Sequence, residues 1–317
     1  MKNRIPLNSR SNVLGIDVGG TNTVFSIVAE DGTMAVTGTV KTQDYPTAEE
    51  LFHAIKTIVS TWDHSLVQTL QGVGIGVPNG NYYTGEVLAP PNLPWSDIHL
   101  VPFIQSLFDL QCVITNDANA AALGEMYFGQ ARNMKHFIAL TLGTGLGSGL
   151  VVNGKVVYGH DGLAGELGHL TVVPEGRVCG CGRRGCLETY VSAPGLVRTA
   201  TEIGWLPTSG SATARAVFDA AQEGDSTARE AFNITGMTLG QAMANMVAVL
   251  SPEAIILSGG LAQAGESLLE PAQAALEDHV MRSFRGKTRF LLSALDNESI
   301  AVQGAAALIY QEHRTPV

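Results

Sequence analysis

The chain has 317 residues, of which 45% are hydrophobic and 15% are charged, and this composition predicts a folded protein with room for two packed domains. The formal net charge of −10 and the pI near 5.2 leave no surplus of basic surface, so we expect no nucleic acid and no anionic membrane among the partners. The polar start MKNRIPLNSRSN lacks the apolar core of a signal peptide, and no later run is long and apolar enough to span a membrane, so we expect a cytoplasmic protein.

The first part of the chain alternates β-branched runs with glycine turns and then changes to helical periodicity. Apolar residues such as Leu51, Ile55 and Val59 recur at the spacing of one helix face. In chain order we predict the strands Val13–Asp17, Val24–Glu30 and Met34–Val40, the helix Ala48–Thr61, the strand Val73–Val77, the helix Ile98–Leu110 and the strand Val113–Thr115.

The same order begins again in the second part of the chain. We predict the helix Asn119–Phe128, the strands Phe137–Leu142, Ser148–Val152 and Lys155–Tyr158, the helices Ala193–Ile203, Ala212–Gln222 and Ser226–Leu250, the strand Ala254–Leu257, the helix Glu266–His279, the strand Thr288–Leu292 and a closing helix after Ala301. Two α/β lobes fit this repetition better than one continuous sheet. We expect a small N-terminal lobe of residues 1–117 and 302–317, and a larger C-terminal lobe of residues 118–301.

Three glycine turns follow predicted strands. Their sequences are Asp17-Val-Gly19-Gly20-Thr21-Asn22, Gly143-Thr144-Gly145 and Ser258-Gly259-Gly260. Free backbone N–H groups in such turns can surround phosphate, and Asp17 can hold a hydrated magnesium ion. A tight hairpin with a capping aspartate explains the first turn equally well. Neither the dinucleotide-binding fingerprint nor the P-loop spacing is present.

Asn116 and Asp117 lie between a predicted strand and an alanine-rich helix. Both residue types cap helices by accepting hydrogen bonds from free N–H groups, and on spacing alone this reading is favoured. The alternative is a carboxylate that accepts a proton from a substrate hydroxyl.

His169, Cys179, Cys181 and Cys186 have the spacing H-x9-C-x-C-x4-C. Three thiolates and one imidazole complete a tetrahedral Zn²⁺ site, which we prefer to a set of free cysteines. Four protein ligands leave no open position, so we expect a structural zinc.

These segments resemble the ROK group (repressors, open reading frames, kinases) of sugar kinases and related regulators. GIDVGGTNT and LTLGTGLGSG resemble its two phosphate motifs, NDANAAALGE its catalytic segment, and SGGLA its adenosine motif. GELGH with CGCGRRGCLE resembles its zinc and sugar signature. The matches run in family order from about residue 13 to residue 307.

The resemblance implies a two-lobed actin-like ATPase (ribonuclease H-like) α/β fold, with magnesium-bound ATP in the interdomain cleft and a hexose beside it. It implies Asp117 as the general base and Asp17 as the carboxylate on the magnesium side. Sugar contacts are implied for Asn79, Asn92, Asn116, Asp117, Glu166, His169 and Glu188, phosphate contacts for Gly19, Gly20, Thr21, Asn22, Gly143, Thr144 and Gly145, and adenosine contacts for Gly259 and Gly260.

Among hexoses, Glu166, His169 and Glu188 together favour glucose through the same resemblance. N-acetylmannosamine, mannose, fructose and allose stay open as substrates, and so does polyphosphate as donor. Two other classes are a sugar-responsive repressor, whose DNA-binding segment would have to precede Val13, and a sugar-binding protein without catalysis. We expect the kinase, because both aspartates and both phosphate turns are present. Family members suggest a homodimer or a dimer of dimers.

Overall fold

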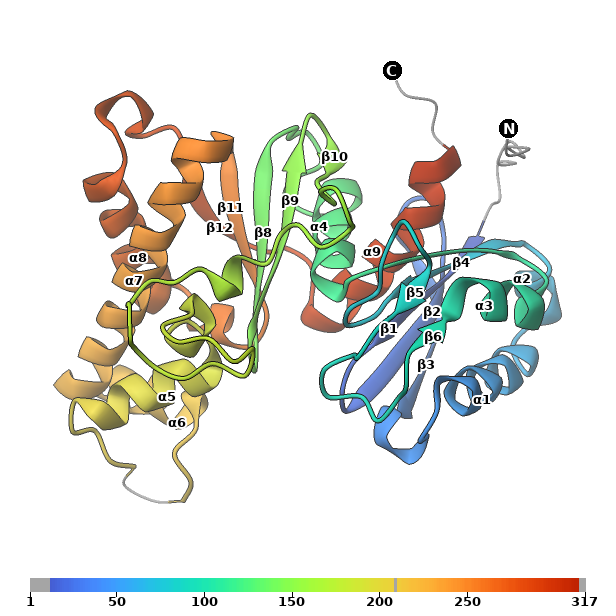
Figure 1. Cartoon of the computed structure of the whole chain (residues 1–317), viewed down its shortest axis with the longest axis horizontal. Helices are drawn as coiled ribbons and strands as arrows, with labels where there is room; N and C mark the ends of the chain where they lie inside the picture. Colours follow the sequence, from blue (N-terminus) through green and yellow to red (C-terminus); the bar gives the residue numbers. More distant parts are fainter. Residues whose placement is uncertain (1–11, 208–209, 314–317) are drawn as a thin grey trace. The chain divides into compact units, whose positions relative to one another are not determined.

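The computed structural model describes residues 12–207 and 210–313, which divide into two compact units (Figure 1). The first unit runs through Asn133 and also contains Tyr158–Ala164 and the chain from Leu295. The second contains Met134–Val157 and Gly165–Ala294. The predicted polar start lies, up to residue 11, outside the described residues. Within the described ranges, no helix combines the length and the apolar character of a membrane span.

The first unit is built on a five-stranded sheet with the order β3-β2-β1-β4-β7. The first three strands form an antiparallel meander, and β4 and β7 run parallel to β1. A small two-stranded sheet and three helices complete this part of the unit. Their bounds are β1 Asn12–Val18, β2 Asn22–Val28, β3 Met34–Lys41, α1 Ala48–Ser60, α2 His64–Val67, β4 Leu70–Gly76, β5 Glu86–Val87, β6 Ile98–His99, α3 Leu100–Phe108 and β7 Gln111–Thr115.

The second unit has a five-stranded sheet with the corresponding order, β10-β9-β8-β11-β12. Its first three strands are again antiparallel, and β11 and β12 run parallel to β8. The predicted repetition of strand order is therefore confirmed, and it includes the strand directions. The bounds are β8 Phe137–Leu142, β9 Leu146–Val152, β10 Lys155–Val156, α5 Ala193–Glu202, α6 Ala214–Glu223, α7 Ser226–Leu250, β11 Ala254–Ser258, α8 Glu266–His279 and β12 Arg289–Leu292.

Each unit has its own apolar core. In the first unit, Leu51, Phe52 and Ile55 of α1 are fully buried together with the inner residues of β1 and β4. In the second, Phe232 and Leu239 of α7 belong to one cluster with the strand residues of β8 and β11. Burial of these helix faces stabilises each sheet from the side on which the helices lie.

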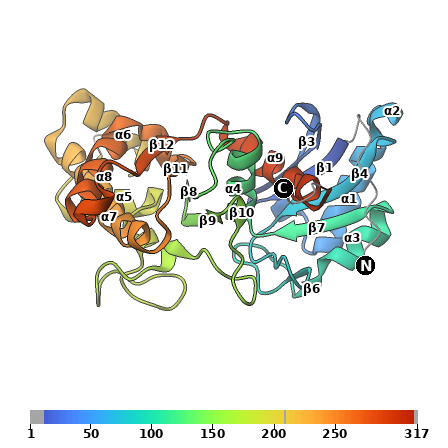
Figure 2. The same cartoon turned by 90° about the horizontal axis from the view of Figure 1, so that it is seen from above.

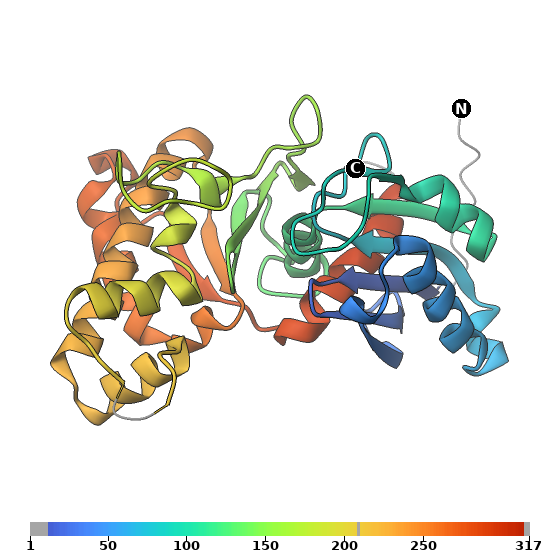
Figure 3. The same cartoon turned by 60° about the horizontal axis from the view of Figure 1, so that its bottom comes forward.

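Two helices of the first unit pack through glycine and alanine. They are α4 (Asp117–Tyr127) and α9 (Asn297–His313), which lie side by side (Figure 3). A Cβ at Gly304 would overlap the backbone of Ala120, and one at Gly124 would overlap the carbonyl oxygen of Ile300. Only residues without a Cβ allow the two backbones to approach this closely.

The same helix α9 lies against β1 and β4 (Figure 2). A Cβ at Gly15 would overlap the carbonyl oxygen of Val302, and one at Gly74 that of Ala305. The sheet, α9 and α4 therefore form one closely packed body.

This packing moves the predicted boundary between the lobes. We expected residues 118–301 in the C-terminal lobe, but α4 and the chain through Asn133 belong to the first unit because α4 packs on α9. Tyr158–Ala164 also joins the first unit, where the Tyr158 ring stacks on Tyr82 with centroids 4.1 Å apart.

Most predicted elements are confirmed within a few residues at each end. The predicted helix Ile98–Leu110 begins two residues later, because Ile98 and His99 pair with Val87 and Glu86 as β6. The short helix α2 was not predicted, and the closing helix starts before Ala301.

Candidate functional site

Two carboxylates of the first unit lie beside each other at one edge of the sheet. Asp17 is near the end of β1, and Asp117 is the first residue of α4, two residues after the end of β7. Gly76 of β4 lies between them, since a Cβ there would be 3.7 Å from Asp17 Oδ1 and 3.6 Å from Asp117 Cα. The parallel pairing of β1, β4 and β7 brings their carboxyl ends to this edge, which is where open α/β sheets bind ligands.

Both carboxylates hold protons more tightly than usual. Burial, and then repulsion from Asp117, raise the pKa of Asp17 to about 7. Burial also raises the pKa of Asp117, against the hydrogen bond that its Oδ1 accepts from the N–H of Ala118 at 2.8 Å. Asp117 is nevertheless exposed to solvent. A ligand could therefore reach its carboxylate, although surrounding protein atoms raise its pKa. A cation or a proton at this edge would relieve the repulsion.

Asn116 caps α4, as the spacing of the sequence predicts. Its Oδ1 accepts a hydrogen bond from the N–H of Ala118 at 2.8 Å. Asp117 follows within the first helical turn, where the helix dipole favours an anion. Capping by Asn116 and an accessible carboxylate at Asp117 therefore coexist.

The first glycine turn joins β1 and β2, and Asn92 lies against it. The N–H of Gly19 donates to the carbonyl of Asn22 at 3.0 Å, and a Cβ at Gly20 would be 3.0 Å from Asn92 Cβ. Thr21 and Asn22 are exposed on this turn.

Asn79 has a structural function that its residue type alone does not reveal. It adopts the left-handed conformation with φ 56°, and its Nδ2 donates to the carbonyls of Leu88 and Ala89 at 3.0 and 3.1 Å. Its amide group therefore holds the loop that leads toward Asn92.

In the second unit, the turn Gly143–Gly145 joins β8 and β9. The N–H of Gly143 donates to the carbonyl of Gly145 at 3.0 Å, and no atom lies within 4 Å of a Cβ placed on Gly143. Thr144 is exposed at its tip. A Cβ on Gly145 would be 3.0 Å from Glu188 Oε2, so the turn and this carboxylate are neighbours.

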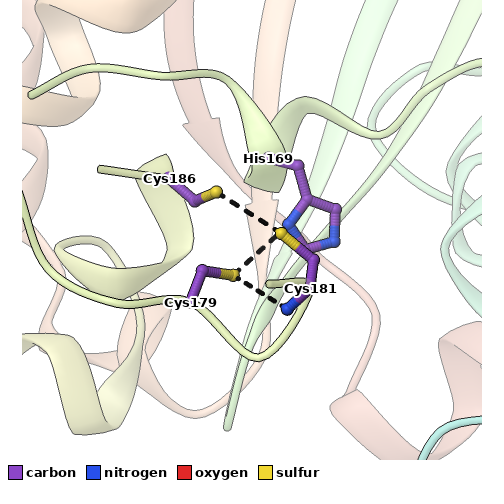
Figure 4. A group of neighbouring side chains, drawn as sticks. All are labelled: His169, Cys179, Cys181 and Cys186. Carbon is purple, nitrogen blue, oxygen red and sulfur yellow. Dashed lines mark hydrogen bonds between the residues drawn. The ribbon is translucent and has the colours of Figure 1, made fainter. Parts of the chain in front are cut away.

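The side chains of His169, Cys179, Cys181 and Cys186 point toward one another (Figure 4). One ligand atom from each lies within 4.8 Å of the others. Cys181 Sγ and Cys186 Sγ are 3.7 Å apart, and Cys179 Sγ is 3.6 Å from His169 Nδ1. A tetrahedral zinc with Zn–S bonds of about 2.3 Å separates neighbouring sulfurs by about 3.8 Å. The four side chains therefore fit this ion.

Two carboxylates flank the imidazole of this cluster. Glu188 Oε1 is 3.6 Å from His169 Nδ1 and 2.8 Å from Cys179 Sγ, while Glu166 Oε2 is 3.9 Å from His169 Nε2. The ring nitrogen nearer the thiols is thus separate from the one nearer Glu166. Imidazole can use one nitrogen for a metal and the other for a second partner.

Ser148 is a residue of this site that the sequence analysis did not single out. It is buried on β9, where its Oγ donates to the carbonyl of Gly165 and accepts from the N–H of Leu167 at 3.0 Å. These two groups lie on either side of Glu166. The contact depends on tertiary structure, because the partners are 17 and 19 residues away along the chain.

Gly259 and Gly260 differ in their surroundings. Gly259 has φ +90°, and a Cβ there would be 2.5 Å from the carbonyl oxygen of Leu142, so packing between β8 and β11 requires this glycine. Gly260 has φ −61°, and nothing lies within 4 Å of an added Cβ. Only Gly260 presents an open backbone.

Several of the predicted residues thus form a group in each unit. The first unit brings Asp17 and Asp117 together and places Asn92 at the Gly20 turn. The second brings Glu166, His169, Glu188 and the three cysteines together beside Gly145.

Comparison with known proteins identifies relatives of this arrangement. The ROK family model matches residues 13–312. The glucokinase of Halalkalibacterium halodurans is 34% identical over 321 residues, covering 95% of this chain and 96% of that protein. The N-acetylmannosamine kinase of Yersinia pestis is 34% identical over 249 residues, covering 78% of this chain and 82% of that protein.

A solved structure extends the similarity to the fold. The ROK family glucokinase from Streptomyces griseus, in complex with glucose and AMPPNP, has a TM-score of 0.79 and 32% sequence identity, covering 95% of this chain and 100% of that chain. The predicted two-lobed, actin-like ATPase fold is confirmed.

Gly259 and Gly260 should respond differently to substitution by alanine. Gly259→Ala forces a strained φ and a contact with Leu142, which costs about 1 to 3 kcal/mol, so thermal unfolding should show a Tm several degrees lower. Gly260→Ala should leave Tm unchanged. Equal losses of Tm in both variants would contradict the assignment of Gly260 as the open position.

The high pKa of Asp17 predicts a pH-dependent stability. The folded state keeps this proton up to a pKa of about 7, whereas an unfolded aspartate loses it near 3.8, so Asp17 lowers stability as pH rises between these values. Without divalent cations, Asp17→Asn should therefore raise Tm at pH 8 and have less effect at pH 4. Asp44→Asn, at an exposed position, is the control. A gain in Tm that is the same at both pH values would refute this origin.

Proposed function

Because the chain belongs to the ROK family, we propose that it is an ATP-dependent hexokinase that phosphorylates the primary hydroxyl of a hexose, with glucose as the preferred substrate. The observation that carries the proposal is the pair of carboxylates Asp17 and Asp117 on either side of Gly76. A kinase of this type needs a base for the sugar hydroxyl and a carboxylate on the magnesium side of the phosphates.

In this mechanism Asp117 accepts the proton of the primary hydroxyl. The sugar oxygen attacks the γ-phosphorus, the bond to the β-phosphate oxygen breaks, and ADP leaves while the proton stays on Asp117. The hydroxyl becomes acidic only as its bond to phosphorus forms, so a carboxylate is a sufficient base. The access of Asp117 to solvent and its raised pKa support this assignment.

Phosphate binding would use the backbone of the two glycine turns, with Gly19, Gly20, Thr21 and Asn22 in one and Gly143, Thr144 and Gly145 in the other. Asp17 would hold magnesium on its side of the phosphates, where the ion would neutralise their charge. The adenosine end would approach Gly260, whose backbone is open, more closely than Gly259.

The sugar would be held mainly by carboxylates and amides. Glu166, Glu188 and the Nε2 atom of His169 would accept or donate hydrogen bonds to ring hydroxyls, and several such contacts orient a hexose better than one. The remaining sugar contacts in the proposal are those of Asn92, Asn116, Asp117 and the backbone near Asn79.

The zinc of the proposal is structural. His169 through Nδ1, together with Cys179, Cys181 and Cys186, would hold it, and the separations of their ligand atoms support this. The ion would keep Glu188 and His169 in place without touching the reacting atoms.

A kinase for another hexose is the second candidate. Among the other hexoses, N-acetylmannosamine is favoured by the similarity to an N-acetylmannosamine kinase. Mannose, fructose and allose, polyphosphate as donor, and a sugar-binding regulator without catalysis are further alternatives. Assembly as a homodimer or dimer of dimers and a cytoplasmic location stay predictions of the family resemblance.

The test measures ADP release with ATP as donor over a panel of these hexoses. With polyphosphate as donor, the sugar phosphate that forms is measured instead. We expect glucose with ATP to have the highest kcat/KM. Asp117→Asn should lower kcat by about 10² to 10⁴-fold, the range expected for a lost general base, while glucose affinity changes little. Near-normal kcat in this variant would show that Asp117 is not the base.

Removal of one zinc ligand should affect metal and sugar together. Cys181→Ser should lower the zinc content measured by atomic emission and raise the KM for glucose, because the loop that holds His169 and Glu188 loses one of its metal ligands. Cys112→Ser is the matched control, since Cys112 is buried in β7 of the other unit. Loss of zinc with an unchanged KM for glucose would refute the coupling.

A further inference from the structure

A buried arginine lies in the loop between His169 and Cys179. The Arg177 side chain is only 6% exposed, which is unusual for a residue type that is mostly at the surface. Neither the zinc site nor the phosphate turns account for it, since its guanidinium contacts neither group of residues.

The guanidinium connects two other segments of the second unit. Nη1 donates to the carbonyls of Thr189 and Gly195 at 2.7 and 3.2 Å, and Nη2 donates to Thr199 Oγ1 and Glu202 Oε2 at 2.9 and 2.6 Å. Thr189 ends the short helical turn Leu187–Thr189, and the other three partners belong to α5. Arg177 therefore ties its own loop and this turn to a regular helix.

Tyr190 strengthens the same connection. Its ring lies 4.3 Å from the Arg177 guanidinium carbon, and its hydroxyl oxygen accepts a hydrogen bond from the Arg177 backbone N–H at 3.0 Å. A Cβ at Gly176 would overlap this hydroxyl, so the loop and the tyrosine are in close contact. Cation–π contact and charge-assisted hydrogen bonds are strongest where water is excluded.

Glu188 lies between two independent attachments. Cys186, two residues before it, belongs to the metal cluster, and Thr189 and Tyr190, directly after it, contact Arg177. A metal can hold only the first end of this turn. The second end is held by the backbone bonds from the N–H groups of Tyr190 and Val191 to the Leu187 carbonyl, at 2.9 and 2.8 Å. To these Arg177 adds the one side-chain bond to the Thr189 carbonyl found among the described residues.

We propose that Arg177 is a positioning residue for hexose binding, which holds Glu188 beside the Gly145 turn independently of the zinc site. The inference rests on the proposed function, because it assumes that Glu188 contacts the sugar. Loss of Arg177 would let the Glu188 carboxylate shift from its place beside Gly145. A shift of about 1 Å is enough to weaken binding or slow a reaction by a large factor.

The test compares Arg177→Met with Arg198→Met. Arg198 donates to the same Glu202, at 2.8 Å, but is 53% exposed and contacts no residue of the turn. Glucose affinity is measured by titration calorimetry without nucleotide, zinc by atomic emission, and ADP affinity and Tm on the same preparations.

We expect Arg177→Met to weaken glucose binding about tenfold or more, with wild-type zinc content and ADP affinity. Arg198→Met should match the wild type in all three. If Arg177→Met does not fold, Arg177→Lys carries the test, because lysine keeps the charge and one donor direction but not the fork; it should weaken glucose binding less and keep the zinc.

Unchanged glucose affinity in the Arg177 variants, or loss of glucose affinity only in proportion to lost zinc, would overturn the inference. A wild-type chain that binds none of the hexoses in the panel would instead overturn the proposed function, and the inference with it. The two failures are therefore distinguishable.

Discussion

The geometry of the first unit depends on the close approach of α9 to the sheet on one side and to α4 on the other. Gly15 and Gly74 admit α9 to β1 and β4, and Gly124 and Gly304 admit it to α4. A methyl group at any of these positions would meet a backbone carbonyl or amide, which cannot rotate away as a side chain can. Protein interiors transmit such displacements, so these four glycines contribute to the position of Asp117 relative to Asp17.

This packing also explains how the unit tolerates two neighbouring carboxylates. Burial disfavours the ionised form of both carboxylates and raises the pKa of each, and repulsion from Asp117 adds to this effect at Asp17. The cost is offset by the apolar core under α1 and by the helix contacts. A cation at this edge would lower the repulsion between the two carboxylates and would favour their ionised form.

The second unit positions its polar residues by a different principle. Glu166, His169 and Glu188 lie outside the long helices and strands, in or beside the short helical turns Leu167–His169 and Leu187–Thr189. Side chains add further bonds to these turns: Ser148 bonds on both sides of Glu166, Arg177 bonds to the residue after Glu188, and the three cysteines lie close together in the loop between them. A long strand and a long helix hold Asp17 and Asp117 in the first unit. In the second unit, side-chain bonds around short turns help to hold Glu166 and Glu188.

The amino-acid sequence by itself determined the order of the elements, the family and most of the candidate residues, because strand and helix periodicity, glycine turns and cysteine spacing are local patterns. It did not determine the lobe boundary at Asn133, the link of Ser148 to Glu166 or the contacts of Arg177. These features depend on contacts between groups that are distant along the chain. Arg177 gives no sign of its contacts in the sequence, because arginine is usually a surface residue. Only the fold of the backbone brings such groups within hydrogen-bonding distance. Local sequence patterns therefore cannot predict these contacts.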